Sequence, residues 1–229
     1  MNTKREKSDS LIDISLPLHP GIPIWPGSVG IYITRTMSLE AGDTANVTRL
    51  DCDVHVGTHV EAPRHFLKEG ISIDRVLLDT LVGPAEVADL RGISVITPFD
   101  LDRLDLAPGT TRLLLRTRNS ELWAADERKF QKDYVALSSE AARWITDYGI
   151  ELIGVDYLSV QRFEEGPMTH QILMRAGVII IEGLNLSAVE SGRYELICLP
   201  LRLTDAEAAP ARAALRPLHA DSGMDEEKS

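Results

Sequence analysis

The sequence predicts a single α/β domain with a mixed β-sheet, and three features support this. The chain has 229 residues, which suits one large domain or two small ones. Its first half is rich in strand patterns, whereas its second half contains two helix-then-strand units. Neither an internal repeat nor a clear linker divides the chain. We therefore expect one domain over residues 11–217, with flexible tails at 1–10 and 218–229.

Strand patterns dominate the first half. The segment 46–56, NVTRLDCDVHV, alternates strictly between apolar and polar residues, which predicts a half-buried strand. Residues 20–27, PGIPIWPG, contain three prolines and two glycines and therefore predict a rigid loop. In all, we expect strands over residues 11–18, 31–39, 46–56, 83–90 and 112–117.

Two later segments share one plan. Ser138 is a serine cap for a helix that ends at Gly149, and residues 150–155 follow as a strand. Thr169 begins a shorter helix that ends at Gly177, and an apolar strand then runs to Glu182. Such helix-then-strand units are typical of an α/β domain.

The composition excludes several classes of partner. The net charge is −11, from 35 acidic and 24 basic residues. This balance argues against nucleic acid, because nucleic-acid binding requires a basic surface. The longest aliphatic run, Val178–Ile181, is too short to cross a membrane, and the polar first ten residues do not resemble a signal peptide. Cys52 and Cys198 are too few for a disulfide framework, so we expect a cytoplasmic protein.

Three of the six histidines and one glutamate lie in a segment of eleven residues, His55 to His65. Crowded imidazole and carboxylate groups are typical of a metal site. On a straight strand His55 and His59 would be about 13 Å apart. Two ligands of one ion cannot be so distant, because metal–nitrogen bonds are roughly 2.0–2.1 Å. If both bind one ion, the strand must end near His55 and the chain must turn, which Gly57 makes easy.

Thr58 and Pro63 bound the turn that this hypothesis requires. Thr58 can cap a single helical turn that carries His59 and Glu61, and Pro63 ends that turn. His65 follows on the far side of the proline, so it can reach the same pocket without being a ligand. A single histidine on a strand is usually structural, but this set of four side chains favours a metal site.

His170 and Glu182 form a second candidate pair. The helix that His170 opens rises about 10 Å over seven residues, and the strand that ends at Glu182 returns roughly 13–16 Å. Both residues therefore come to one edge of the sheet, where sites of α/β proteins tend to lie. The helix dipole should also keep His170 neutral, as a metal ligand requires. Taken alone, either residue is an ordinary polar residue at the end of an element.

At this point the sequence resembles a known family. The segment HVGTHVEAPRHF, residues 55–66, resembles the HxGTHxDxPxH signature of the metal-dependent cyclase/hydrolase superfamily, which includes kynurenine formamidases and isatin hydrolases. DISLPLHPGIPIWPG resembles the opening strand and loop of that family, and HQILMRAGVIIIEGLNL resembles its second ligand segment. The resemblance spans roughly residues 11–203. It implies a swivelling β/β/α fold that commonly forms homodimers or homotetramers.

The resemblance also implies roles for individual residues. His55, His59 and Glu61 would bind a first metal ion, and Glu61 would bridge to a second ion that His170 and Glu182 complete. His65 would be the histidine that transfers protons. The family usually has aspartate where this chain has Glu61, which leaves open whether one ion or two are bound.

The ligand set contains imidazole and carboxylate but no thiolate, which suits Zn²⁺, Mn²⁺ or Fe²⁺. A non-redox ion of this kind, Zn²⁺ or Mn²⁺, activates water for attack on an amide or formamide carbon. His65 can then protonate the departing nitrogen. Trp25 is a candidate wall for an aromatic substrate, although a tryptophan that only packs in the core fits equally well.

These observations predict a metal-dependent hydrolase that cleaves a C–N bond of a small, aromatic amide, N-formyl or lactam substrate, as a kynurenine formamidase does. A cyclase or dehydratase of the same family is one alternative. A non-haem iron oxygenase is another, because two histidines and one carboxylate also form its facial triad. A protein that binds metal or ligand without catalysis is a third, but it would have no need of a proton shuttle at His65.

Overall fold

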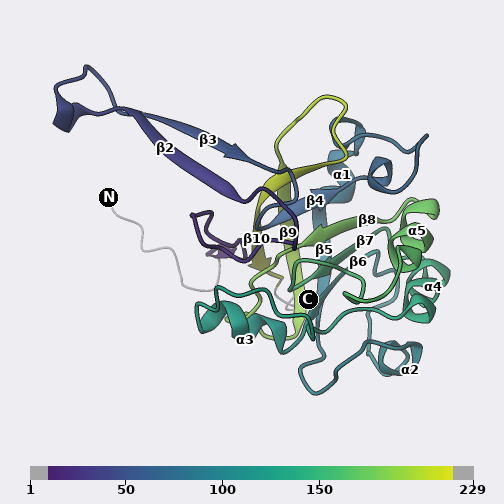
Figure 1. Ribbon diagram of the computed structural model, residues 1–229. Helices are drawn as coiled ribbons and strands as arrows, with labels where there is room; N and C mark the ends of the chain where they lie inside the picture. The colour runs from purple at the N-terminus through teal and green to yellow at the C-terminus, as the bar shows by residue number, and fades with distance from the viewer. Residues whose placement is uncertain (1–9, 219–229) are drawn as a thin grey trace, which may run out of the picture.

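A computed structural model describes residues 10–218, and it consists of a barrel-like sheet with a layer of helices against one part of it and a long projecting arm (Figure 1). The main sheet has eight strands in the order β1-β10-β4-β8-β7-β6-β5-β9. Because β10 also pairs with β9, seven of these strands close into a barrel-like sheet. Its strands are β1 (Ile12–Asp13), β4 (His59–Glu61), β5 (Val82–Asp89), β6 (Arg112–Arg116), β7 (Leu152–Val155), β8 (Ile179–Glu182), β9 (Gly192–Pro200) and β10 (Ala208–Pro217).

The four strands β5, β6, β7 and β8 run parallel, and the other pairings of the main sheet are antiparallel. Helices connect the parallel strands, as parallel pairing requires. The α-helices are α1 (Leu78–Leu81), α2 (Pro98–Leu101), α3 (Asn119–Ala124), α4 (Ser139–Tyr148) and α5 (Met168–Arg175). The 3₁₀ helices are η2 (Leu39–Ala41), η3 (Pro63–His65) and η4 (Ile73–Arg75). The sequence prediction of one α/β domain with a mixed sheet is therefore confirmed.

Two hydrophobic cores lie on the two faces of the sheet. Alternation along β6 places Leu114 in the core inside the barrel and places Leu113 and Leu115 in the core beneath the helices. Helix α4 packs against α5 and α2 over this second core. Ser138 caps α4 by accepting a hydrogen bond from the amide of Ala141, as the sequence predicts. Among the residues that the structure describes, no helix is long and apolar enough to cross a membrane.

The arm is a separate two-stranded sheet made of β2 (Ile31–Met37) and β3 (Val47–Cys52). Nearly every residue of both strands is exposed, so the expectation of a half-buried strand over residues 46–56 is wrong. The alternation in that segment is real, but Leu50 on its apolar side is 51% exposed, and burial begins only at its end, where Cys52 and Val56 pack into a small hydrophobic cluster. The strand also ends at Cys52, three residues before His55, which allows the turn that a metal site requires.

Other expectations need smaller corrections. The predicted strand over residues 11–18 is reduced to β1 and one bridge between Ser15 and Leu184. His59 and Glu61 lie in the short strand β4, not in a helical turn capped by Thr58. Pro63 begins the 3₁₀ helix η3 where the sequence predicted a stop. The predicted flexible tails lie, apart from Ser10 and Leu218, outside the described residues.

Two glycines fix the chain where β4 meets β8. Gly183 has a φ of +71°, and a Cβ there would lie 2.2 Å from the carbonyl oxygen of Gly57. Gly57 has a φ of +58°, and its own Cβ would lie 2.4 Å from Leu18. The hydroxyl of Thr58 joins the two segments, since it donates to the carbonyl oxygen of Gly183 at 2.5 Å. Only glycine permits this close approach of two backbone segments.

Gly183→Ala should therefore destabilise the protein by about 3 kcal/mol or more, because it adds a backbone clash to left-handed strain. Gly177→Ala is the matched control, since Gly177 has a φ of +81° but open space around it. The control should cost only about 1–2 kcal/mol. Urea unfolding of both variants measures the difference, and equal losses would contradict the close-approach argument.

Candidate metal centre

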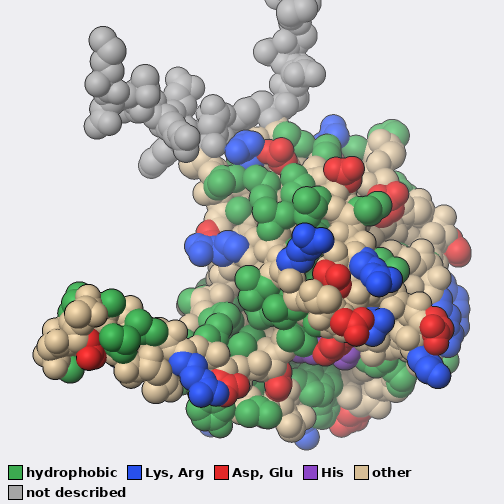
Figure 2. All heavy atoms as spheres, turned by 90° about the horizontal axis from the view of Figure 1, so that it is seen from above, with side chains coloured by type: hydrophobic (Ala, Val, Ile, Leu, Met, Phe, Trp, Pro, Cys, Tyr) green, Lys and Arg blue, Asp and Glu red, His purple; other side chains and the backbone are tan. Residues whose placement is uncertain are grey.

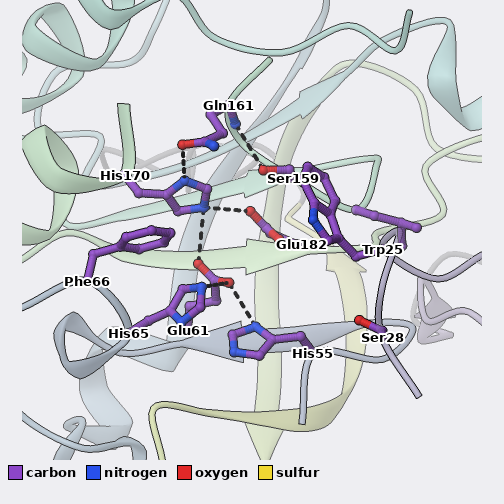
Figure 3. Close-up of a pocket in the computed structure, with 11 residues that line it drawn as sticks. Trp25, Ser28, His55, Glu61, His65, Phe66, Ser159, Gln161, His170 and Glu182 are labelled. Atoms are coloured by element: carbon purple, nitrogen blue, oxygen red, sulfur yellow. Dashed lines mark hydrogen bonds and ion pairs between the residues drawn. The ribbon is translucent and has the colours of Figure 1, made fainter. Parts of the chain in front are cut away.

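A cavity of about 370 Å³ opens beside the ends of β4 and β8. Figure 3 shows imidazole and carboxylate groups converging at its floor, with an aromatic wall beyond them. The lining residues are Trp25, Ser28, His55, Glu61, His65, Phe66, Leu158, Ser159, Gln161, His170 and Glu182. Every site residue predicted from the sequence lines this cavity except His59. His59 does not border the cavity, but its Nε2 atom lies 3.7 Å from Glu61 Oε1.

Strand pairing places the buried donors. His59 and Glu61 are two residues apart on β4, so their side chains lie on one face of that strand. In the antiparallel ladder with β8, His59 lies opposite Glu182. All three side chains are almost fully buried, at 1% exposure for His59 and 2% for each carboxylate residue. The sheet itself therefore brings together residues that are more than a hundred positions apart.

A first group of donors surrounds Glu61. The Nδ1 atom of His55 lies 3.0 Å from Glu61 Oε1. The Nε2 atom of His59 lies 3.7 Å from that same oxygen and 3.5 Å from Glu182 Oε2. His55, which comes from the turn after the arm, thus reaches the same carboxylate as the residues of β4.

A second group shares that carboxylate. His170, in the first turn of α5, places its Nε2 atom 3.1 Å from Glu182 Oε1 and 3.4 Å from Glu61 Oε2. The amide of Val160 donates to Glu182 Oε1 at 2.7 Å, which fixes that side chain. The structure therefore brings His170 and Glu182 into contact with the group around Glu61, as the helix-then-strand geometry predicts.

The donor atoms fit a divalent cation. Within the described part of the chain, the ligand atoms of His55, His59 and Glu61 lie within 4.8 Å of one another, and so do those of Glu61, His170 and Glu182. Three buried polar atoms of these residues, His55 Nε2, His59 Nε2 and Glu61 Oε2, have no hydrogen-bond partner. Buried polar groups are rarely left unpaired. Imidazole nitrogen and carboxylate oxygen are the donors that Zn²⁺ and Mn²⁺ accept.

Two of the three histidines in these groups form a hydrogen bond through their other ring nitrogen. His59 Nδ1 lies 3.0 Å from the carbonyl oxygen of Gly57, and His170 Nδ1 lies 2.7 Å from Gln161 Oε1. Such partners are typical of metal-binding histidines, because they fix which nitrogen carries the proton. His55 differs: its Nε2 atom lies 3.4 Å from Glu207 Oε1, within ion-pair distance, but the two atoms form no hydrogen bond.

Sequence reasoning missed Gln161 and Glu207. Gln161 lies shortly after the carboxyl end of β7, a parallel strand. Sites of α/β proteins tend to lie at such ends, so this position could have indicated that Gln161 borders the cavity. Glu207 comes from the loop before β10 and reaches His55 only through the pairing of β10 with β4. No local pattern around Glu207 marks it.

The two buried carboxylates dominate the electrostatics of the site. Burial lowers the pKa of His59, but hydrogen bonds and charges from Glu182 and Glu61 outweigh burial and raise it to about 10. Burial likewise lowers the pKa of His170, and the same carboxylates raise it to about 9. The expectation that the dipole of α5 keeps His170 neutral is therefore wrong for the protein without metal. The pocket stabilises positive charge, which is also what a bound cation supplies.

His65 lies at the rim of the same group. Its Nε2 atom lies 3.6 Å from Glu61 Oε1, and its ring lies 4.2 Å from the ring of His55. Its side chain is 28% exposed, in contrast to the buried His59 and His170. Burial is the largest effect on the pKa of His65 and lowers it below the ordinary histidine value; Glu61 opposes this lowering. A neutral imidazole that borders the cavity can accept and return a proton.

The wall opposite the histidines is aromatic. Trp25, on the proline-rich loop, lies 5.3 Å in ring-centroid distance from both Phe130 and Phe163. It therefore packs in an aromatic cluster and also lines the cavity (Figure 3). Phe66 flanks the histidines, with its ring 4.6 Å from that of His170. The two roles weighed for Trp25 in the sequence, packing and lining, are both present in the structure.

Comparison with known proteins agrees with this geometry. Residues 12–162 match the family described as "Putative cyclase". The chain is 37% identical to a kynurenine formamidase of Bacillus cereus over 213 residues, which covers 93% of this chain and 100% of that protein. It is also 37% identical to cyclase-like protein 1 of Arabidopsis thaliana, covering 90% of this chain and 84% of that protein.

A solved structure described as a potential metal-dependent hydrolase with cyclase activity superposes with a TM-score of 0.78 at 35% identity. The superposition covers 92% of this chain and 99% of the other. The family resemblance read from the sequence is therefore confirmed, and the chain belongs to the cyclase family of metal-dependent hydrolases.

Proposed function

We propose that this protein is a metal-dependent hydrolase that cleaves the C–N bond of a small, aromatic amide, N-formyl or lactam substrate. The observation that carries the proposal is the convergence of five imidazole and carboxylate side chains, four of which line one cavity beside the partly exposed His65. Relatives named kynurenine formamidase, 36–37% identical to this chain, support the amide chemistry. A cavity of about 370 Å³ lies at the small end of ligand pockets, as a substrate with one ring requires.

The proposed cofactor is Zn²⁺ or Mn²⁺, in one or two copies. His55, His59 and Glu61 would hold one ion, and Glu61, His170 and Glu182 would hold the other. Glu61 places one oxygen toward each group, Oε1 toward His55 and Oε2 toward His170. A bridging carboxylate therefore needs no rearrangement of the chain, although glutamate stands where the family usually has aspartate.

When bound, the ion supplies an activated water molecule and polarises the substrate carbonyl group. The side chains of the protein do the remaining work. Neutral His65 accepts a proton at Nε2 as water attacks the carbonyl carbon, and it donates that proton to the departing nitrogen. Trp25 and Phe66 bound the space for the ring of the substrate and orient its carbonyl group toward the histidines. The C–N bond breaks to give a carboxylic acid and an amine.

Of the alternatives, an iron oxygenase fits the site less well. A facial triad of two histidines and one carboxylate leaves open positions for oxygen and cosubstrate. Here His170 and Glu182 add two further donor side chains beside Glu61, with His170 Nε2 3.4 Å from Glu61 Oε2. A cyclase or dehydratase of the same family would use the same donors, and a substrate panel separates these reactions from hydrolysis.

The metal dependence is directly testable. The purified protein should contain a stoichiometric divalent metal and should hydrolyse N-formylaniline derivatives. Removing the metal with a chelator should abolish that hydrolysis, and added Zn²⁺ or Mn²⁺ should restore it. Elemental analysis together with a formamide and lactam panel measures both properties. Hydrolysis that persists in metal-free protein would refute the proposal.

Two histidine variants test the division of roles. His65→Ala should keep the metal and lose roughly 10²–10⁴-fold in kcat, the usual span for a lost general acid or base. His59→Ala should lose the metal itself, because His59 is buried against both carboxylates. Metal content and kcat of each variant give the comparison. If His65→Ala contained no metal, His65 would be a metal ligand. If His65→Ala kept its metal and its full kcat, another group would have to transfer the proton.

We also propose a cytoplasmic homodimer or homotetramer that associates through the arm. The register of β2 and β3 pairs Ile31 with Cys52 and Ile33 with Leu50, so these four apolar side chains lie on one face of the arm. Ile33 and Leu50 are 42% and 51% exposed in the single chain. An isolated two-stranded sheet is marginally stable in water, so a second copy covering this face would stabilise it. Figure 2 shows the arm projecting from the body with apolar side chains on it.

Ile33→Glu should then convert the oligomer into a 25.3 kDa monomer, because the apolar face would carry a charge in each copy. Thr34→Glu is the control, since the neighbouring residue points to the opposite face of the arm. Light scattering coupled to size-exclusion chromatography measures the mass. A monomeric wild-type protein, or an unchanged mass for Ile33→Glu, would argue against association through the arm.

A further inference from the structure

Gln161 touches the metal centre only through His170. Its Oε1 atom lies 2.7 Å from His170 Nδ1, which is the shortest contact that either ring nitrogen of His170 makes. Both side chains are buried. Figure 3 shows the amide on the side of the imidazole away from the two carboxylates. The imidazole therefore lies between Gln161 on one side and Glu182 and Glu61 on the other.

The backbone of Gln161 is held on both sides. The hydroxyl of Tyr134 donates to the backbone carbonyl oxygen of Gln161 at 2.5 Å. The backbone amide of Gln161 donates to Ser159 Oγ at 3.3 Å. Gln161 also forms a parallel bridge with Leu137. Its amide nitrogen Nε2 lies 3.5 Å from the carbonyl oxygen of Glu165, which directs Oε1 toward His170. The position of the acceptor atom is thus set before any ion binds.

An amide oxygen can only accept a hydrogen bond, so Nδ1 of His170 must carry the proton in this contact. When the imidazole is neutral, its lone pair is then on Nε2. That atom faces Glu182 Oε1 and Glu61 Oε2 at 3.1 and 3.4 Å. The ring of Phe66 lies against the imidazole at 4.6 Å and limits its rotation.

We propose that Gln161 is the positioning residue of the metal position formed by Glu61, His170 and Glu182. This inference rests on the proposed metal-dependent function. Gln161 fixes the tautomer and the direction of His170, whereas His59 depends on the carbonyl oxygen of Gly57 and is independent of Gln161. Loss of the amide should therefore weaken one metal position and leave the position at His55 and His59 intact.

Calorimetric titration of metal-free protein with Zn²⁺ tests this assignment. Gln161→Leu removes the acceptor at nearly constant size and should weaken one binding event 10–100-fold, the usual loss for a partner of a metal ligand. Gln161→Glu keeps an oxygen acceptor and should restore most of that affinity. Gln171→Leu is the matched control. Gln171 follows His170 directly on α5, but its side chain contacts Arg175 and not the imidazole of His170. The control should bind Zn²⁺ as the wild type does.

Long-range ¹H–¹⁵N spectra of the zinc-loaded wild-type protein give a second measurement that needs no variant. They should show His170 protonated at Nδ1 and bound through Nε2. The reverse tautomer would overturn the inference, and so would unchanged Zn²⁺ affinities in Gln161→Leu. The wild type can also show a single Zn²⁺ binding event. In that case, weaker Zn²⁺ binding by Gln161→Leu supports the inference, and unchanged Zn²⁺ binding by Gln161→Leu contradicts it. Failure of the underlying proposal is distinguishable, because the wild type would then bind no Zn²⁺ at all.

Discussion

The pairing of β4 with β8 is the constraint on which the site depends. It sets His59 opposite Glu182 and, by alternation, turns Glu61 to the same side. The close approach of Gly57 and Gly183 at the end of this pairing leaves no room for a Cβ atom. Three of the five proposed ligands, His59, Glu61 and Glu182, are therefore positioned by strands of the sheet. Such placement gives more precise geometry than a site built on mobile loops.

The arrangement also explains why the site can accommodate a cation. Two carboxylates buried within one group of side chains would be costly to ionise without compensating charge. In the protein alone, His59 and His170 provide that charge, since their pKa values rise to about 10 and about 9. A divalent ion can replace those protons. His65 is more exposed than these two histidines, and its pKa is lowered because burial, the largest effect on it, outweighs the opposing charge of Glu61.

The local sequence was sufficient to predict those parts of the site that lie on consecutive elements, such as one helix and the strand that follows it. The helix and strand that carry His170 and Glu182 were predicted because Gly177 and an apolar run mark them, although α5 begins at Met168 and not at Thr169. The local sequence was insufficient where pairing between distant segments decides the structure. Residues 59–61, for example, form a strand because β8 and β10 flank them. The arm shows the opposite failure, since its alternation predicts burial that the single chain does not provide. Glu207 was not predictable, because only the pairing of β10 with β4 brings it to His55.

The most direct test of the account is anomalous diffraction from crystals of the protein grown with Mn²⁺ or Zn²⁺. We expect an anomalous peak in the cavity within about 2.0–2.3 Å of a Glu61 oxygen and of at least one histidine nitrogen. Occupation of both groups would give a second peak on the other oxygen of Glu61. A cavity without any anomalous peak at saturating metal, or ions bound only at the protein surface, would contradict the central claim.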